Sequence, residues 1–526
     1  MSSPEKLKVV NDEAPNAEKV EIHKVENAGD DDSSFQRAEY GGEAPNHKLV
    51  RQLKNRHIAM ISIGGVIGTG LFLGTATSLR NGGPVGLLLG YLAMGSICYT
   101  VMISLGEMIA YLPIPGGHIA LAERFVNPAW SFTMGWNYWY NWTIILPAEL
   151  SAASVLIGFW THGDISPAVW ITVCLVIVVV INLLGAGAYG EAEFIFASIK
   201  VITIVGLIIL GIVLDLGGGP NHDRLGFRYW KHPGAFAQYH GIEGAKGRFL
   251  GWWAVMTQAA FSFIGTEIVA IAAAEAKNPR RNLPRAIKRV YIRILLFYIL
   301  GTFIIGLLVP STDPRLDLQD GTAASSPFVL AIQNAGIKGL PSVINACLLT
   351  SAWSAASSDL YTSSRALSTK NGLPYVSVIF CALFSVLAYM GIQKGSGRVF
   401  GWFANMTAVA GLMTWFGISF TYLRFYCGTK LPYYTRLQPF AAWYSMCFSL
   451  FICIGTSSLI SQFFSSVDGV YSLKDNWSTE TFITNYLPLG LFPVLYAGSR
   501  YYYRKPITAP KDMDFVSNIA EIEADT

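Results

Sequence analysis

The sequence predicts an all-α integral membrane protein with about twelve transmembrane helices. Of its 526 residues, 52% are hydrophobic and only 14% are charged, and the mean hydropathy is +0.40. A soluble globular chain carries about 25% charged residues. Eleven of the 34 acidic residues precede His47 and five follow Lys511, so the long middle of the chain has few groups that require water. This balance argues against a soluble enzyme.

The charge pattern, the cysteines and the absence of enzyme motifs argue against a nucleic-acid-binding protein, a disulfide-rich or zinc protein, and an enzyme. The net charge of +4 lacks the clustered basic face of a nucleic-acid-binding protein, so we expect no nucleic-acid partner. The seven cysteines lie in or beside apolar runs and not in the spaced pairs of a disulfide framework or zinc site. Enzyme motifs such as H-E-x-x-H and the P-loop do not occur, so we predict no catalytic residue, cofactor or metal.

Two polar tails flank the apolar region. Residues 1–46 are rich in charged and small polar residues, a composition that buries too little apolar surface to offset the entropy of ordering. Residues 506–526 have a similar composition. We therefore divide the chain into an N-terminal tail (1–46), a transmembrane region (47–505) and a C-terminal tail (506–526), and we expect both tails to be disordered.

Apolar stretches recur through the transmembrane region with short polar breaks. Each has about 17 to 25 residues, enough for a helix to cross a hydrocarbon core of about 30 Å. The twelve stretches begin near His57, Pro84, Asn127, Pro167, Glu193, Trp252, Ala286, Pro341, Tyr375, Val399, Phe440 and Thr481.

The basic residues between the stretches predict the orientation in the membrane. An even number of spans places both tails on one side. The basic clusters Lys48–Arg56, Lys277–Arg285 and Arg500–Lys505 all fall on that side. Because basic residues favour the cytoplasmic side, we expect both termini to be cytoplasmic.

Four glycines stand within seven residues of the first span, at Gly64, Gly65, Gly68 and Gly70. A continuous helix would lose about 3 to 4 kcal/mol relative to alanine, so we expect a break. Free backbone groups persist inside a membrane only when they are buried in protein or line a cavity. A half-helix beginning near Thr69 would point N–H groups at an anion such as a carboxylate. A glycine face for close helix packing is the alternative.

The sixth span has its own interruption from Phe261 to Glu267, where serine, glycine, threonine and a carboxylate stand in an apolar segment. Alone, this motif is equally compatible with a polar seam between helices. Two interruptions five spans apart indicate an inverted-repeat transporter, in which the substrate binds between discontinuous helices near the middle of the membrane.

Four long stretches of the chain occur in a characteristic order: RQLKNRHIAMISIGGVIGTGLFLGT, GEMIAYLPIPGG, GWNYWYNWTIILPAELSAA and AAFSFIGTEIVAIAAAEAKNPRRNLPRAIKRV. They resemble fungal amino-acid permeases of the amino acid–polyamine–organocation superfamily. The resemblance covers about residues 47–505. It implies a leucine-transporter-like five-plus-five inverted repeat with two C-terminal helices. It also implies a plasma-membrane location and proton-coupled import of amino acids by alternating access.

The resemblance assigns substrate contacts to the first span. The carboxylate of the amino acid would meet Thr69 and Gly70, and Gly68 would allow its close approach. The α-ammonium group would meet backbone carbonyls near Val66.

The resemblance assigns further substrate contacts to the sixth span. The α-ammonium group would also meet carbonyls in the turn from Ser262 to Ile264, which Gly265 follows. Phe261 aligns with the aromatic residue that closes over the bound amino acid in this superfamily. A phenylalanine of the core or of the lipid-facing surface is the alternative.

Three carboxylates lie well inside spans, at Glu107, Glu149 and Glu267. Each charge at a helix centre costs roughly 2.5 to 3.5 kcal/mol, so these groups must face inward, pair or stay protonated. Glu149 shares a helical face with Asn141, which makes both candidates for substrate contact. Glu267 and Glu107 are candidates for proton coupling. Alternatively, Glu107 and Glu149 tie helices together or cap a helix end.

Lys200 is a lone cation near the start of the fifth span. A lysine away from water is readily deprotonated, so it can exchange protons. In related transporters a lysine in this helix resembles a substitute for the sodium ion of sodium-coupled relatives, which favours a proton as the coupling ion. A lysine that snorkels to the cytoplasmic interface is the alternative.

The eighth and tenth spans supply further candidates. We predict Thr407 as a side-chain selectivity contact, because it lies among small polar residues in the tenth span. We interpret Asp359 and Arg365 as a gate or ion pair at the cytoplasmic end of the eighth span, with structural anchoring as the alternative.

The chain departs from the family pattern at two places. The segments after Leu367 and after Arg424 are shorter than is usual, which leaves an impaired permease as an alternative. A non-transporting amino-acid sensor with the same fold is another. Besides the amino acid, protons and the lipid bilayer, trafficking and ubiquitination machinery is a candidate partner at the lysines of the N-terminal tail.

Overall fold

The computed structural model describes residues 67–114, 116–161, 164–184, 186–268, 290–317, 326–367, 375–428, 435–455 and 479–517. The chain divides into two units, residues 1–42 and 43–526, and every described residue belongs to the second. These residues form helices joined by turns, and no strand occurs among them. The all-α prediction is therefore confirmed. The N-terminal tail and Val66 lie outside the described residues.

Described helical segments stand at the positions of the predicted spans, although residues 57–66 of the first span lie outside the described residues and its helix runs on from η2 into α2. In chain order these are η2 (Gly70–Gly74), α2 (Thr75–Tyr111), α4 (Pro128–Thr161), α5 (Pro167–Leu183), α6 (Ala186–Asp215), α7 (Gly244–Phe263), η5 (Ile294–Ile299) with α10 (Leu300–Leu308), α12 (Leu340–Ala366), α13 (Tyr375–Leu383) with η8 (Phe384–Met390) and α14 (Gly391–Lys394), α15 (Ser396–Gly428), α16 (Phe440–Ile454) and α18 (Thr479–Tyr503). The connections add α3 (Gly117–Phe125), η3 (Trp230–Gly234), η4 (Tyr239–Gly241), η6 (Pro314–Leu316), α11 (Pro327–Asn334) and η9 (Pro510–Asp512).

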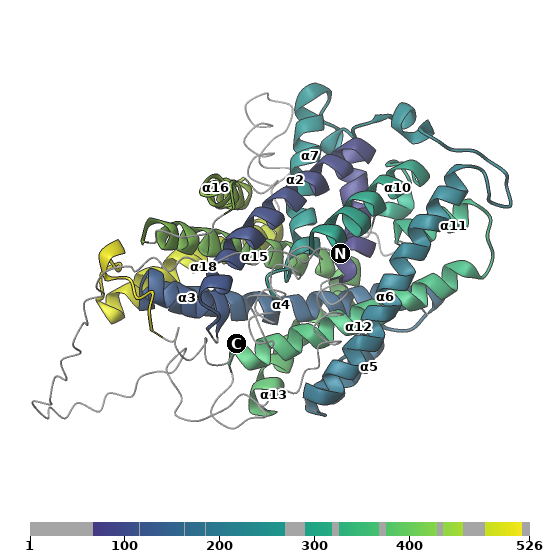
Figure 1. The fold of residues 1–526 in the computed structure, drawn as a ribbon. Coiled ribbons are helices and arrows are strands. Elements are labelled where there is room, and N and C mark those ends of the chain that lie inside the picture. The colour runs from purple at the N-terminus through teal and green to yellow at the C-terminus, as the bar shows by residue number, and fades with distance from the viewer. Residues whose placement is uncertain are drawn as a thin grey trace, which may run out of the picture. The chain divides into compact units, whose positions relative to one another are not determined.

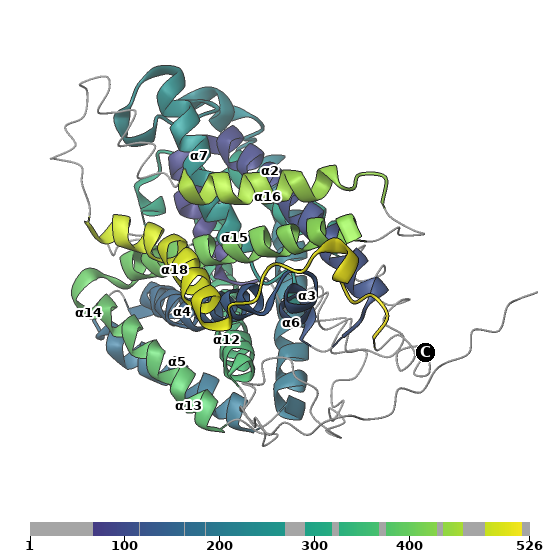
Figure 2. The same ribbon diagram turned by 90° about the vertical axis from the view of Figure 1, so that its left-hand side faces the viewer.

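Helices α4 and α15 form the centre of the described bundle. Helix α12 packs along α4, and α16 and α18 pack against α15 (Figures 1 and 2). The most apolar window is 83% buried in both α4 and α15, but only 33% buried in the segment 375–394. Six helical segments of the described residues are long and apolar enough to cross a membrane. The outer helices therefore expose apolar side chains, as a bilayer requires.

Glycines bring α2 and α7 into close contact, the arrangement by which small residues join helices in membranes. Val255 of α7 fills the space beside Gly82 and Gly90 of α2, where added Cβ atoms would lie 2.6 and 2.4 Å from its side chain. At Gly251, an added Cβ atom would lie 2.3 Å from the backbone oxygen of Asn81. The two helices consequently approach more closely than larger side chains would allow.

Residues 506–517 of the C-terminal tail are packed against the helices, although their composition predicts disorder. We call them the C-terminal strap. The ring of Phe515 stacks on Phe125 of α3 at a centroid separation of 5.3 Å, and Arg124 forms a 2.9 Å ion pair with Asp514. Burial raises the pKa of Asp514, but hydrogen bonds from two backbone N–H groups and the charge of Arg124 lower it to about 2. The ion pair therefore persists at neutral pH.

We expect Gly251→Ala to destabilise the protein by about 1 to 3 kcal/mol, because the methyl group would collide with backbone that cannot move independently. Gly401→Ala of α15 is the matched control, since no heavy atom outside its own helix lies within 4 Å of the added carbon. Thermal unfolding of the purified protein in detergent, followed by tryptophan fluorescence, measures both. Equal midpoints for the two variants would contradict the close packing of α2 and α7.

Candidate functional site

The helix of the first span begins inside the protein. Ile67 and Gly68 are not helical, and the helix starts at Thr69 and continues through η2 into α2. The Thr69 side chain does not cap this start, because its hydroxyl donates to Oε1 of Glu149 at 3.0 Å. The first N–H groups of a helix have no partner within it, so this start offers donors to a bound anion. The predicted half-helix start near Thr69 is confirmed, whereas Gly64 and Gly65 lie outside the described residues.

The helix of the sixth span also ends inside the protein. Helix α7 stops at Phe263, and Ile264 is extended, with φ −61° and ψ 146°. Gly265 has φ 88°, in the left-handed region that favours glycine. The hydroxyl of Thr266 then donates to the carbonyl of Phe263 at 2.6 Å, which satisfies one carbonyl freed by the break. The predicted second break is confirmed as well.

The two breaks lie directly against each other. A Cβ atom on Gly70 would lie 2.8 Å from Oγ of Ser262 and 2.9 Å from the ring of Phe261. The hydroxyl of Tyr91 in α2 forms a 2.9 Å hydrogen bond with Ser262. The carbonyl of Ile67 accepts a 3.3 Å hydrogen bond from Ser351 of α12. Neighbouring helices thus fix the backbone at the junction.

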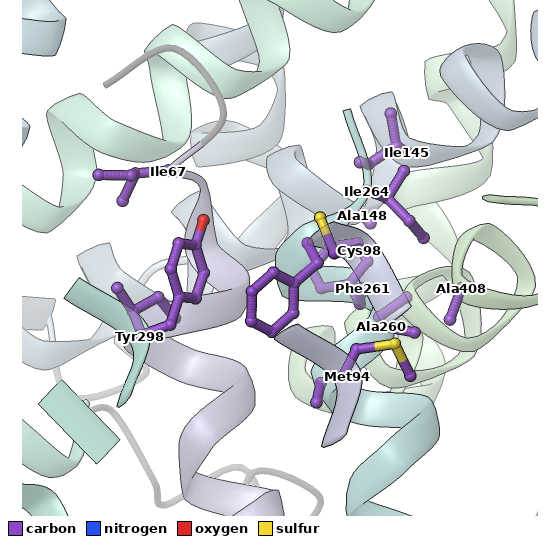
Figure 3. Close-up of a cluster of buried hydrophobic side chains, with 14 of the residues drawn as sticks. Ile67, Met94, Cys98, Ile145, Ala148, Ala260, Phe261, Ile264, Tyr298 and Ala408 are labelled. Carbon is purple, nitrogen blue, oxygen red and sulfur yellow. The ribbon is translucent and has the colours of Figure 1, made fainter. Parts of the chain in front are cut away.

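A small cavity opens between the two breaks. Seven of the eleven predicted substrate contacts line it: Gly68, Gly70, Glu149, Phe261, Ser262, Ile264 and Gly265. Its volume is about 40 Å³. In the same measure, one water molecule needs roughly 10 to 15 Å³. Figure 3 shows Ile145 of α4 together with Ile264 and Phe261 in the apolar cluster at this place. Binding of a large solute therefore requires the walls to move apart.

Asn141 and Thr407 do not line the cavity, although both were predicted to contact the substrate. Both side chains are fully buried, and their polar atoms have no hydrogen-bond partner within the part of the chain that the structure describes. On α4, Trp142 and Ile145 occupy the face toward the cavity. On α15, Phe400 instead contacts the site, because its ring packs edge-on against Phe261 at 5.7 Å.

Helix α12 contributes three cavity residues that the sequence interpretation did not assign to the substrate. They are Ala355, Ser358 and Asp359, which share a face because they are three and four residues apart. Asp359 was interpreted as part of a gate with Arg365. The structure turns Asp359 toward the cavity, whereas the guanidinium of Arg365 lies 3.1 Å from the ring centroid of Tyr361. The remaining unassigned lining residues are Trp142, Ile145 and Ile268.

Glu107 ties elements together away from the cavity. One of its oxygens accepts a hydrogen bond from the hydroxyl of Tyr422 in α15. The other accepts one from the backbone N–H of Thr435 at 2.9 Å. Both oxygens are thus satisfied, which supports the structural alternative for this residue.

Glu267 lies at the second break, behind the cavity. Its Oε2 accepts a 3.3 Å hydrogen bond from the indole of Trp415. Arg293, which the sequence interpretation missed, is buried, donates to the hydroxyl of Thr266 at 3.0 Å and interacts electrostatically with Glu267. The sequence contained a signal for this residue, because an arginine within an apolar span is a candidate functional group. The interaction of Glu267 with Arg293 connects the second break to the helical segment Val290–Leu308.

Lys200 is buried in α6, with 1% of its surface exposed. Its ammonium group therefore does not snorkel to an interface, which was the alternative interpretation. The nitrogen has no hydrogen-bond partner among the described residues. Lys200 does not line the cavity, but it interacts electrostatically with Glu149, which does.

Residues 57–509, which include both breaks and the cavity, match the amino acid permease family. The chain belongs to this family. The permease is 40% identical to the proline-specific permease of Saccharomyces cerevisiae, over 92% of this chain and 80% of the relative. It is also 40% identical to the dicarboxylic amino acid permease of the same yeast, over 90% of this chain and 80% of the relative. The protein is therefore a multi-pass membrane protein that transports amino acids, and not an enzyme.

A solved structure shows the same fold. The manganese transporter of Eremococcus coleocola is 13% identical, with a TM-score of 0.54, and the match covers 88% of this chain and 96% of the transporter. At this identity the likeness concerns the fold alone. It agrees with the predicted all-α membrane fold.

We expect Gly70→Ala to reduce amino-acid uptake at least tenfold, because the added carbon would push the two breaks apart at Ser262. Gly74→Ala in the same short helix is the matched control, since nothing lies within 4 Å of its added carbon. Uptake of labelled amino acids by permease-deficient cells, normalised to surface protein, measures both. If the two variants transported equally well, the contact between the breaks would not matter for transport.

Proposed function

We propose that this permease imports neutral amino acids across the plasma membrane together with protons, by alternating access to the cavity between its two broken helices. The observation that carries the proposal is the contact of Gly70 with Phe261 and Ser262, which places the start of one half-helix against the end of another. Membership of a permease family favours transport over the sensor alternative.

The two breaks suit the two charges of an amino acid. The backbone N–H groups at the helix start, at Thr69 and Gly70, would hold the substrate carboxylate, as helix starts hold anions. The extended backbone from Ser262 to Ile264 would offer carbonyl groups to the α-ammonium. Gly68 and Gly265 keep the approach open on both sides. We assign the ammonium contact near Val66 on the resemblance alone, since that residue lies outside the described residues.

The walls of the cavity favour a neutral side chain. Most are apolar, and the charged lining residues are the two carboxylates Glu149 and Asp359, which would repel an anionic side chain. Glu149 already accepts a hydrogen bond from Thr69, so it is partly engaged without a substrate. The relatives do not indicate which substrate this chain binds, because the proline-specific and the dicarboxylic amino acid permeases are equally similar to it.

Lys200 and Glu149 support proton coupling. Both are buried, they interact electrostatically, and each has a polar atom without a hydrogen-bond partner in the described ranges. Groups in such surroundings gain or lose protons when a neighbouring charge arrives. Glu267 is a further candidate at the second break. We assign Glu107 to helix packing because both of its oxygens have partners.

The orientation and the tail functions belong to the same proposal. We place both termini in the cytoplasm on the distribution of basic residues, with the N-terminal lysines as sites for ubiquitination. The two short segments fall at residues 368–374 and 429–434, outside the described residues. The helices before them, α12 and α15, are continuous to Ala366 and Gly428. This continuity supports an active permease over an impaired one.

Uptake into permease-deficient cells should be at least fivefold faster at pH 5 than at pH 8, and a protonophore should abolish accumulation. The reason is that import would be driven by protons moving down their gradient with the substrate. The measurement is the initial rate and the final level of labelled neutral amino acids. Uptake indifferent to both external pH and the protonophore would refute proton coupling.

Phe261→Ala should raise KM about tenfold, which corresponds to about 1.4 kcal/mol of lost contact with the substrate. Phe261→Leu is the control, because it keeps apolar bulk at the same place. Saturation curves for proline, leucine, lysine and aspartate measure the effect and the selectivity together. An unchanged KM in Phe261→Ala, or a preference of the wild type for aspartate, would contradict the substrate site as proposed.

A further inference from the structure

One lysine and three carboxylates form a buried cluster between α4, α6 and α12. Its members are Lys200, Glu193, Glu149 and Asp359, each at most 3% exposed. Lys200 interacts electrostatically with all three carboxylates. Glu193 marks only the beginning of a span in the sequence. The structure makes it part of the charged interior.

Each member of this cluster has a buried polar atom to which the described residues offer no hydrogen bond. These atoms are Nζ of Lys200, Oε1 of Glu193, Oε2 of Glu149 and Oδ2 of Asp359. Buried charges are costly unless they are paired and hydrogen-bonded. One ammonium group balances only one carboxylate. Two of the three carboxyl groups must therefore carry protons for the cluster to be neutral.

Glu193 differs from the other two carboxylates because it does not line the substrate cavity. Glu149 and Asp359 do, and a bound substrate would act on them directly. Glu193 lies seven residues before Lys200, which is two turns along the same face of α6. Helical side chains lean toward the start of their helix, so the Lys200 side chain extends toward Glu193.

Hydroxyl groups continue from Glu193 toward the start of α6. Ser354 donates to Oε2 of Glu193 at 2.6 Å, and Ser358 lies 3.5 Å from the same oxygen. Ser358 also forms a 2.9 Å hydrogen bond with the hydroxyl of Tyr189. Tyr189 stacks on Tyr361 of α12 at 4.0 Å. Hydroxyls both donate and accept, so this row can pass a proton.

The groups that face Glu193 come from few elements. On its own helix they are Lys200 and Tyr189, and on α12 they are Asp359 and the two serines. Helices α5 and α10 also pack against α6, but their sequences contain no charged residue. Among the described residues, Lys200 is thus the cation that interacts electrostatically with Glu193.

We propose that Glu193 is the second carrier of the coupling proton, between Lys200 and the cytoplasm. The Lys200 ammonium gives one proton to the Glu193 carboxylate, which leaves a neutral amine and a neutral carboxylic acid. Glu193 then releases the proton through the hydroxyls of Ser358 and Tyr189 to cytoplasmic water. Lys200 regains a proton from the cavity side, through Glu149 or Asp359. This assignment rests on the proposed proton coupling.

The test compares two kinds of transport by the full-length permease in liposomes. One is accumulation of labelled proline and leucine driven by a pH gradient. The other is counterflow, the exchange of labelled external for unlabelled internal substrate at equal pH, which requires no net proton movement. Glu193→Gln should lose at least tenfold in accumulation and keep counterflow within twofold of the wild type. Glu193→Asp should restore accumulation at least in part.

The matched control is Glu191→Gln, an exposed carboxylate two residues away on the same helix, which should leave both activities unchanged. Gradient-driven accumulation by Glu193→Gln at the wild-type level would overturn the assignment. So would a parallel loss of accumulation and counterflow that Glu193→Asp does not rescue, because Glu193 would then only support packing. A wild type that performs counterflow but never accumulates would instead refute the proposed proton coupling itself.

Discussion

The backbone groups that are freed where two membrane helices break are the constraint on which this structure depends. A lipid environment offers them no partner, so protein must surround every such break. Here Ser351 bonds to the carbonyl at Ile67, and Thr266 bonds to the carbonyl at Phe263. Helices α4 and α12 line the cavity beside the junction, and Phe400 of α15 packs against Phe261. A small cavity lies between the two breaks, and the proposal places the zwitterionic substrate there.

The sequence was sufficient for the described helices, for the helix start at Thr69 and for the break after Phe263, because span length and interrupting polar or glycine residues are local signals. It was not sufficient for the rotation of the central helices. Helix α4 is buried on most sides, so apolar periodicity could not show that Trp142 rather than Asn141 faces the cavity. The C-terminal strap was missed for the opposite reason. An average over a polar segment conceals single anchors such as Phe515, whose ring packs on Phe125.

Buried carboxylates of one residue type have different roles here because their partners differ. Both oxygens of Glu107 accept hydrogen bonds from protein donors, so this side chain is held in one place. Glu149 and Glu193 accept hydroxyl hydrogen bonds at one oxygen only, and the described residues offer none to the second oxygen. In the proposed coupling, an open oxygen beside Lys200 lets a carboxyl group gain or lose a proton without breaking a hydrogen bond of the fold. The hydrogen bonds that a buried carboxylate accepts, more than its degree of burial, therefore distinguish a packing role from the proposed coupling role.

The C-terminal strap has a consequence for how the protein is made. Phe125 and Phe425 belong to helices that are synthesised long before Phe515, yet both rings are fully buried in the folded chain and pack against it. Until the ribosome has released the last residues, these rings lack that cover. A chain that ends before Phe515 therefore exposes these two aromatic rings. Chaperones and proteases can recognise premature termination at this one place on the surface.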